Sequence, residues 1–339
     1  MTCFPLPSSL PAGTHDGTLR GMSKVVCVVW MNEAVVYARA LEHARLADRI
    51  EFHGVRNDQP IPVDLAARCE VLVGWRPAPG LLGTMPRLRW IQSTTAGMEN
   101  WLGDPQLRAD VLLTCARGAH RVQMPENILA ALFFLTKPLM QCALDQRERR
   151  WTRRISEPLA GRTLGILGLG AIGQELARKA EALEMTVIGT KRSPAPLPHI
   201  ARVYAPEATD AVLAASDFVL LLLPATRDTE NFMDARRFQQ MRRSAWLLNF
   251  ARGALVVDED LIEAVRSKTI AGAVLDVFRK EPLPADHPFW TTEGIVVLPH
   301  IGGLHPTRDE AVAEVFVANF ARYLEGKPLV TTVDRTLGY

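Results

Sequence analysis

A glycine-rich hexapeptide, GLGAIG, constrains the fold of this chain more than any other feature of its sequence. It follows the apolar segment TLGIL and precedes QELARKAEALE, which has helical periodicity. In that setting Gly168 permits a tight turn, Gly170 lets the backbone approach a pyrophosphate, and Gly173 lets the helix pack on the strand. Ala171 and Ile172 would open the helix whose N-terminus faces the phosphates. The hexapeptide therefore predicts a dinucleotide-binding unit rather than an incidental glycine turn.

The stretch VIGTKRSP, residues 187–194, bears on which dinucleotide binds. An acidic side chain commonly ends this strand and hydrogen-bonds the ribose 2'-hydroxyl of NAD. Here the apolar residues are followed by Thr190, Lys191, Arg192 and Ser193. Two cations and two hydroxyls suit a 2'-phosphate. We therefore predict a preference for NADP(H), with NAD(H) and a merely solvated basic turn as the alternative.

Composition excludes few classes of protein, but it narrows the cellular compartment and the kinds of partner to be expected. The 339 residues, 48% hydrophobic and 22% charged, are enough for two domains with buried cores. The formal net charge of +2 comes from dispersed charges, so no basic face suited to nucleic acid is expected. The five cysteines form no C-x-x-C pair, and no apolar run approaches the ~20 residues of a membrane span. We expect a cytoplasmic protein that binds neither nucleic acid nor membrane.

The N-terminal residues and the histidines give two further expectations. Residues 1–22 lack the basic start and apolar core of a secretory signal, and we predict a disordered tail there, with Met22 as an alternative start. None of the eight histidines has a spacing typical of metal ligands, so no metal site is expected.

Short apolar runs alternate with amphipathic segments along the chain, a pattern typical of parallel sheets covered by helices. The first block carries VVCVVW, CEVLVGW, LRWIQS and VLLTCA. The second, from about Gln123, carries TLGILGLG, TVIGT, FVLLLLP, AWLLNF, AGAVLDVF and GIVVLP. Its first helix should be kinked by Pro138. The helical segment 306–326 is expected to pack back on the first block.

The predicted fold is therefore α/β, with two Rossmann-like domains built on parallel sheets. The first domain, substrate-binding, comprises residues 23–121 and is completed by 300–339, which makes it discontinuous. The second, dinucleotide-binding, comprises residues 122–299. Ligands of such open sheets bind at the carboxyl ends of the strands.

Three chemically distinct residues follow strand candidates at that predicted edge. Arg252 comes after AWLLNF, Glu281 lies in the loop after AGAVLDVF, and His300 comes after GIVVLP. A cation, an acid and an imidazole could converge there on one substrate. For each residue taken singly, a surface ion pair or a hydrogen-bonded loop histidine is the alternative.

Four motifs together carry a resemblance to a known family. GLGAIG, NFARGALVVDE, LDVFRKEPLPADHPFW and LPHIGG occur in the order and at the spacing of the D-2-hydroxyacid dehydrogenases. The resemblance covers nearly all of residues 24–339. Within the family, the basic turn after the second strand and the ending VDRTLGY are most similar to the glyoxylate/hydroxypyruvate reductase A branch.

The resemblance implies a role for each candidate catalytic residue. Arg252 would bind the carboxylate and carbonyl oxygen of a 2-keto acid, and His300 would give the carbonyl oxygen its proton during reduction. Glu281 would hydrogen-bond His300 and favour its protonated form. Backbone amides of a loop would hold the substrate carboxylate, and the matching residues are Thr95, Ala96, Gly97 and Met98.

The resemblance also implies cofactor contacts and a partner. Besides the glycine motif, the basic turn and His300, the expected cofactor contacts are Leu223, Pro224, Phe250, Ala251, Asp276, Gly302 and Gly303. Trp151 matches a tryptophan that reaches the partner subunit's active site in relatives, which implies a homodimer. Two departures from the family pattern are the glycines after His300 and Asn127 at the domain crossover, the latter affecting hinge packing.

Two classes of function are consistent with these features. The first is an NADPH-dependent reductase of small 2-keto acids such as glyoxylate or hydroxypyruvate, with bulkier substrates of the phenylpyruvate type left open. The second is a dinucleotide-sensing corepressor without enzymatic activity. The residues bordering the substrate side chain also stay open, the candidates being Trp75, Arg76, Met98 and Trp290.

Overall fold

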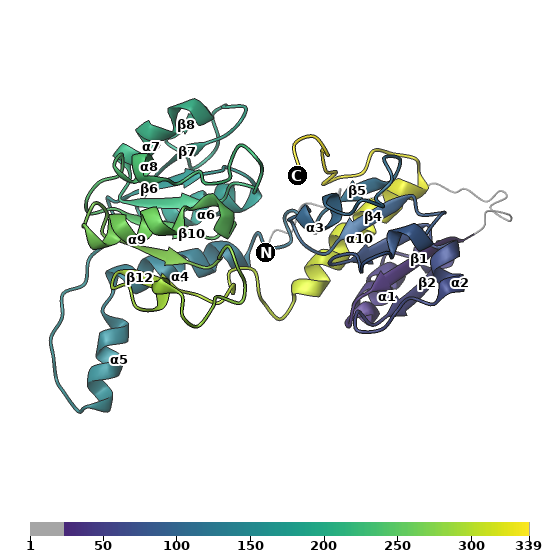
Figure 1. Ribbon diagram of the computed structural model, residues 1–339, viewed down its shortest axis with the longest axis horizontal. Coiled ribbons are helices and arrows are strands. Elements are labelled where there is room, and N and C mark those ends of the chain that lie inside the picture. Colours follow the sequence, from purple (N-terminus) through teal and green to yellow (C-terminus); the bar gives the residue numbers. More distant parts are fainter. Residues whose placement is uncertain (1–23, 339) are drawn as a thin grey trace.

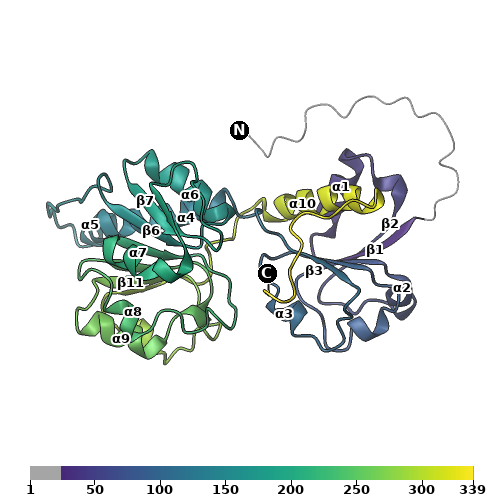
Figure 2. The ribbon, with the colours of Figure 1, turned by 90° about the horizontal axis from the view of Figure 1, so that it is seen from above.

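The computed structural model describes residues 24–338, which form two lobes, each built on one sheet (Figure 1, Figure 2). The tail predicted over residues 1–22 lies outside the described residues. Every strand pair within the two sheets is parallel. The predicted α/β fold with two parallel sheets is confirmed.

The first lobe holds a five-stranded sheet of order β2-β1-β3-β4-β5. The strands are β1 (Val25–Trp30), β2 (Ile50–Val55), β3 (Val71–Gly74), β4 (Trp90–Ser93) and β5 (Leu112–Thr114). Sequence patterning missed β2, because this edge strand mixes Glu51 and His53 with apolar residues and is only half-buried. Its position comes from pairing with β1.

Helices cover this sheet, and one of them comes from the far end of the chain. The helices are α1 (Ala34–His43), α2 (Val63–Arg68), α3 (Glu99–Leu102) and α10 (Arg308–Leu324). Phe316 of α10 stacks on Trp90 at 5.6 Å between ring centroids and meets Tyr37 of α1 edge-on at 6.0 Å. These three rings are fully buried, and their contacts hold the C-terminal helix against the first lobe, as the sequence predicts.

The second lobe holds a seven-stranded sheet of order β12-β11-β10-β9-β6-β7-β8. The strands are β6 (Thr163–Leu167), β7 (Thr186–Thr190), β8 (Arg202–Tyr204), β9 (Phe218–Leu221), β10 (Trp246–Asn249), β11 (Gly272–Leu275) and β12 (Ile295–Val297). Six match the predicted strands, and β8, an edge strand of three residues, was missed. The strand order reverses between β6 and β9, and in open α/β sheets the carboxyl ends at such a point form the crevice that binds ligands.

Helices also cover the second sheet. They are α4 (Gln123–Thr136), α6 (Ala171–Glu181), α7 (Thr209–Ala215), α8 (Ala235–Phe238) and α9 (Asp258–Arg266). Short 3-10 turns connect elements in both lobes: η1 (Ala47–Arg49), η2 (Leu82–Thr84), η3 (Pro206–Ala208), η4 (Gly253–Leu255) and η5 (Pro288–Trp290).

The helix that opens the second block breaks where the sequence predicts. α4 ends at Thr136, and α5 (Leu139–Arg147) begins after Pro138 at an angle of 64°. α5 and the loop that follows it extend away from the second lobe (Figure 1), and Trp151 in this loop is 95% exposed. No single helix within residues 24–338 is long and apolar enough to cross a membrane; α4 and α5 pass such a test only as a bent pair.

Candidate active site

The glycine turn after β6 has the shape that a bound pyrophosphate requires. Gly168 adopts φ +109°, and a Cβ there would lie 2.7 Å from the carbonyl oxygen of Leu222. A Cβ at Gly173 would lie 3.0 Å from the oxygen of Gly168, whereas one at Gly170 would have no atom within 4 Å. The turn is therefore tightly packed at Gly168 and Gly173 and open at Gly170, the residue before α6. The backbone amides at this helix N-terminus are thus placed to bind a dinucleotide.

The basic turn after β7 lies beside the glycine turn. Thr190 accepts a hydrogen bond from the amide of Leu169 at 2.9 Å, and Lys191 Nζ donates to the carbonyl oxygen of Leu169 at 3.3 Å. Thr190 is only 3% exposed, whereas Lys191 is half-buried and Arg192 and Ser193 are exposed. Three of the four predicted phosphate contacts are thus accessible at the adenosine end.

The opposite wall of this end comes from the loop after β9. The amide of Leu222 donates to Leu167 at 2.8 Å, which continues the strand pairing past Leu221. Leu223 and Pro224 follow and are half-buried. Their position beside the glycine turn is consistent with the predicted adenosine contact.

Three neighbouring strands, β10, β11 and β12, deliver the predicted catalytic residues. Arg252 follows β10, Glu281 lies in the loop after β11, and His300 comes after β12. The predicted hydrogen bond is present: His300 Nδ1 lies 2.6 Å from Glu281 Oε2. Glu281 Oε1 accepts from the amide of Phe278 at 2.9 Å, so the carboxylate is held from both sides. The contact uses Nδ1 of the imidazole, and the His300 side chain is 52% exposed.

The loop that carries His300 is shaped by the buried carboxylate beneath it. Asp276, 1% exposed, accepts hydrogen bonds from the amides of Ile301 at 2.8 Å and Gly302 at 2.9 Å. Burial raises the pKa of this carboxyl, and the two amides oppose that effect. A Cβ at Gly302 would lie 2.6 Å from Asp276 Oδ2, so a larger residue would break the contact. His300 itself has φ +53°, a sparsely populated conformation that this contact helps to maintain.

Sequence reasoning assigned Asp276 to the cofactor and missed this loop-holding contact. Both of its oxygens accept backbone hydrogen bonds in the structure, and the cofactor contact stays a prediction. Phe250 and Ala251, which precede Arg252, are buried at 3% and 7% exposure. Gly303 lies at the crossover, where a Cβ would be 3.3 Å from Nδ1 of His120.

The crossover between the lobes contains Asn127, which departs from the family pattern. Its amide donates to the carbonyl oxygens of Ile301 at 3.1 Å and Gly302 at 3.0 Å. The asparagine therefore ties helix α4 to the histidine loop. His120 and His305 meet edge-on here at 6.0 Å between centroids. Burial, Arg308 and His305 lower the pKa of His120 to about 4.

The predicted carboxylate-binding loop comes from the first lobe. Thr95 Oγ1 donates to the oxygen of Gly97 at 2.8 Å, and the oxygen of Thr95 accepts from Ala116 at 2.9 Å. Ala96 is exposed, whereas the Met98 side chain is 1% exposed and lies in the core of the lobe. Its place beside a substrate stays a prediction.

Arg252 reaches across to that loop. Its Nε donates to Glu99 Oε1 at 3.0 Å and its Nη1 to the carbonyl oxygen of Ala251 at 2.7 Å. A Cβ at Gly97 would lie 2.0 Å from Nη2, so only glycine admits the guanidinium here. Sequence reasoning missed Glu99, although an acid directly after the TAGM loop was a signal.

Of the other candidates for the substrate side-chain pocket, Trp75 and Arg76 follow β3, and Trp290 ends η5. Arg76 stacks over the ring of Trp75 at 4.9 Å, and Trp75 is 48% exposed. Trp290 donates from Nε1 to the oxygen of Pro284 at 2.8 Å. These contacts fix the tryptophans without assigning either to a substrate.

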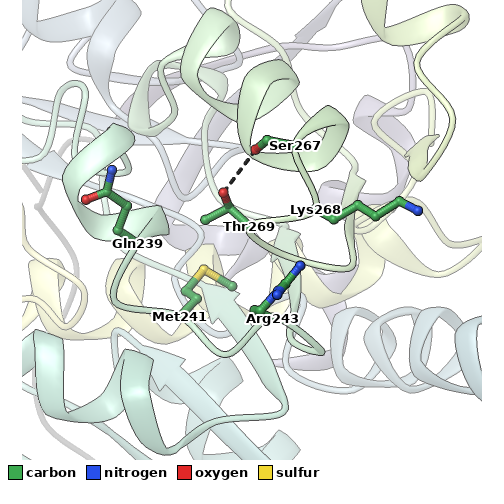
Figure 3. Close-up of a pocket in the computed structure, with 6 residues that line it drawn as sticks. All are labelled: Gln239, Met241, Arg243, Ser267, Lys268 and Thr269. Atoms are coloured by element: carbon green, nitrogen blue, oxygen red, sulfur yellow. Dashed lines mark hydrogen bonds between the residues drawn. The ribbon is translucent and has the colours of Figure 1, made fainter.

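A hollow of about 250 Å³ elsewhere on the second lobe is not part of this site (Figure 3). It lies between the segments that lead into β10 and β11, at the amino ends of these strands and thus opposite the crevice. Its lining residues are Gln239, Met241, Arg243, Ser267, Lys268 and Thr269. Within the described part of the chain, no group of three His, Cys, Asp or Glu side chains is placed to hold a metal ion.

The fold and the crevice define a class of protein. A Rossmann-type sheet with an open glycine turn binds a dinucleotide, and an imidazole paired with a carboxylate at the same edge supplies acid–base chemistry. The class is that of the dinucleotide-dependent oxidoreductases. Within this class, residues 129–302 match the model of the D-isomer specific 2-hydroxyacid dehydrogenase NAD binding domain.

Comparisons of the whole chain agree. Glyoxylate/hydroxypyruvate reductase A of Serratia proteamaculans is 30% identical over 305 residues, which cover 87% of this chain and 95% of that protein. A D-isomer specific 2-hydroxyacid dehydrogenase family protein of Aeromonas salmonicida has a solved structure with a TM-score of 0.83 and 34% identity, covering 92% and 100% of the two chains.

A third comparison comes with a bound cofactor. The NADPH-dependent glyoxylate/hydroxypyruvate reductase of Sinorhizobium meliloti, solved with NADP and sulfate, has a TM-score of 0.80 and 27% identity, covering 93% and 100% of the chains. The chain belongs to the D-isomer specific 2-hydroxyacid dehydrogenase family and is an NAD(P)-dependent oxidoreductase. The resemblance inferred from the four motifs is confirmed.

Proposed function

We propose that the protein reduces small 2-keto acids of the glyoxylate or hydroxypyruvate type to D-2-hydroxy acids with NADPH. The observation that carries the proposal is the 2.6 Å contact between His300 and Glu281. These residues follow β12 and β11, and β11 lies next to β10, which Arg252 follows. The names of the Serratia and Sinorhizobium relatives support this substrate class.

The reaction assigns a task to each of these residues. Bound NADPH supplies a hydride to the carbonyl carbon. Amides of the loop at Gly97 and the guanidinium of Arg252 hold the substrate carboxylate, and Arg252 also stabilises negative charge that develops on the carbonyl oxygen. His300 donates a proton from Nε2 to that oxygen, while Glu281 holds Nδ1 and stabilises the imidazolium. In the oxidative direction His300 takes the proton back.

The proposal is tested by following NADPH absorbance with three substrates. The purified protein should turn over glyoxylate or hydroxypyruvate with a higher kcat/KM than phenylpyruvate. A preference for phenylpyruvate would instead assign a bulkier substrate. Absence of turnover with all three, together with intact NADPH binding, would contradict the reductase and favour a dinucleotide-sensing corepressor.

The preference for NADP(H) belongs to the same proposal. It is supported by the accessible Lys191 and Arg192 beside the glycine turn and by the NADP bound in the Sinorhizobium relative. The double variant Lys191→Ala, Arg192→Ala should raise the KM for NADPH at least tenfold, since one hydrogen bond to a charged group contributes ~1.5 to 3 kcal/mol. KM for NADH should stay nearly constant. Equal weakening of both cofactors would disprove the phosphate contact.

A homodimer in the cytoplasm completes the proposal. The arm formed by α5 and the following loop exposes Trp151, Leu139 and Ile155, and a second copy of the chain would cover them. The four cysteines among the described residues are unpaired, which agrees with a reducing compartment. Light scattering of Trp151→Ala against wild type tests the dimer.

We take residues 23–121 with 300–339 as the substrate-binding domain and 122–299 as the dinucleotide-binding domain.

A further inference from the structure

We propose that Glu99 is a positioning residue for Arg252: it holds Nε of the guanidinium so that Nη2 is aimed at the substrate carboxylate beside Gly97. The inference rests on the proposed function, because it assigns Arg252 to the 2-keto acid. It adds a residue from the first lobe to the machinery of the second.

The contact joins two segments that are far apart in the sequence. Glu99 is the first residue of α3 and follows the carboxylate-binding loop of the first lobe directly. Arg252 follows β10 of the second lobe, and its Nε donates to Glu99 Oε1 at 3.0 Å. An acid from the lobe that binds the substrate carboxylate thus contacts the arginine that binds the same substrate.

Two hydrogen bonds and one packing contact fix the guanidinium. Glu99 holds Nε, and the carbonyl oxygen of Ala251 accepts from Nη1 at 2.7 Å. Nη2 lies against the backbone of Gly97, 2.0 Å from where a Cβ would be. Because the guanidinium is planar, fixing Nε and Nη1 also fixes the direction of both Nη2 protons. Nη2 itself lies beside the loop whose amides would bind the carboxylate.

The energetics favour orientation over stability as the role of Glu99. The Glu99 and Arg252 side chains are 45% and 37% exposed. An exposed ion pair contributes little to folding because solvent screens it and side-chain entropy opposes it. The same contact restricts the rotamers of a long arginine, and a misplaced binding group costs rate even when the fold is intact.

The alternative is that Glu99 competes with the substrate for Arg252. Its carboxylate has the same charge as the substrate carboxylate and already occupies Nε. Under competition, removal of the charge would tighten substrate binding. Under positioning, removal would weaken binding and slow turnover. The two roles therefore predict opposite signs for one variant.

The test is a double-mutant cycle of Glu99→Gln and Arg252→Ala, with Glu99→Asp as the conservative variant. For each protein we would measure kcat/KM for glyoxylate with NADPH and, by calorimetry, the dissociation constant of oxalate from the NADP-saturated enzyme. Oxalate binding needs no turnover, so the Arg252→Ala background remains measurable. Asp110→Asn is the matched control, since Asp110 is an exposed acid of the same lobe that pairs with Arg108.

Positioning predicts that Glu99→Gln lowers kcat/KM and weakens oxalate binding about tenfold, the effect of one charged hydrogen bond. Glu99→Asp should recover part of the loss, and Asp110→Asn should behave as the wild type. The affinity for NADPH and Tm should be unchanged in Glu99→Gln. In the Arg252→Ala background, Glu99→Gln should have no further effect. An equal loss in both backgrounds, no loss, or tighter oxalate binding would overturn the inference. Absence of wild-type turnover would refute the proposed function instead.

Discussion

The pairing of Glu281 with His300 gives a prediction whose size follows from the structure. Glu281→Gln keeps the shape of the side chain, and its amide oxygen can still accept from the amide of Phe278. The amide nitrogen then faces His300 Nδ1, where the wild type has a carboxylate oxygen at 2.6 Å. Two N–H groups cannot share that contact, so the hydrogen bond that holds the proton-donating ring is lost.

The magnitude follows from the loss of a charge-assisted hydrogen bond, which contributes ~1.5 to 3 kcal/mol. The His300 and Glu281 side chains are 52% and 35% exposed, so solvent screening favours the lower end of this range. About 1.5 kcal/mol corresponds to a roughly tenfold change in a rate or equilibrium constant. Reduction at neutral pH should therefore slow about tenfold.

The assay is kcat for glyoxylate reduction at saturating NADPH, with the dissociation constant of NADPH as the control. Glu281→Gln should lower kcat about tenfold, because the carboxylate no longer holds Nδ1 of the ring, and it should leave NADPH binding unchanged. An unchanged kcat, or an equal loss of NADPH binding, would refute the reasoning.

Three further predictions follow. His300→Ala should lower kcat ~100-fold or more with NADPH affinity unchanged, because general acid catalysis contributes ~10²- to 10⁴-fold; near wild-type kcat would require another proton donor. Gly97→Ala should lower kcat/KM at least about tenfold with Tm unchanged, because the new Cβ displaces the side-chain ends of Arg252 and Glu99 rather than backbone; full activity would contradict the close approach. Burial and Arg308 lower the pKa of His120 to about 4, so the unfolded state binds more protons between about pH 6.5 and 4. Stability should fall by roughly 2 to 3 kcal/mol as the pH drops from 7 to 4, and urea denaturation should show a smaller fall in His120→Gln.

The sequence by itself determined the elements whose signals are local. The glycine turn at 168–173 is set by conformations that only glycine adopts readily, and the buried strands by short apolar runs. The edge strands β2 and β8 escaped detection because they are held by pairing with β1 and β7 rather than by their own apolar residues. Pro138 likewise determined the break between α4 and α5, since proline cannot continue the hydrogen-bonding of a helix.

Tertiary structure alone decided how the candidate residues are supported. Sequence order placed Arg252 and His300 after strands, but only the packing of the lobes sets Glu99 beside Arg252 and Asp276 beneath the loop of Gly302. These partners are separated by 153 and 26 residues, and no local periodicity records a contact across such distances. A side chain can be recognised from its neighbours in the chain, whereas its direction and its charge partner depend on which segments the fold brings together.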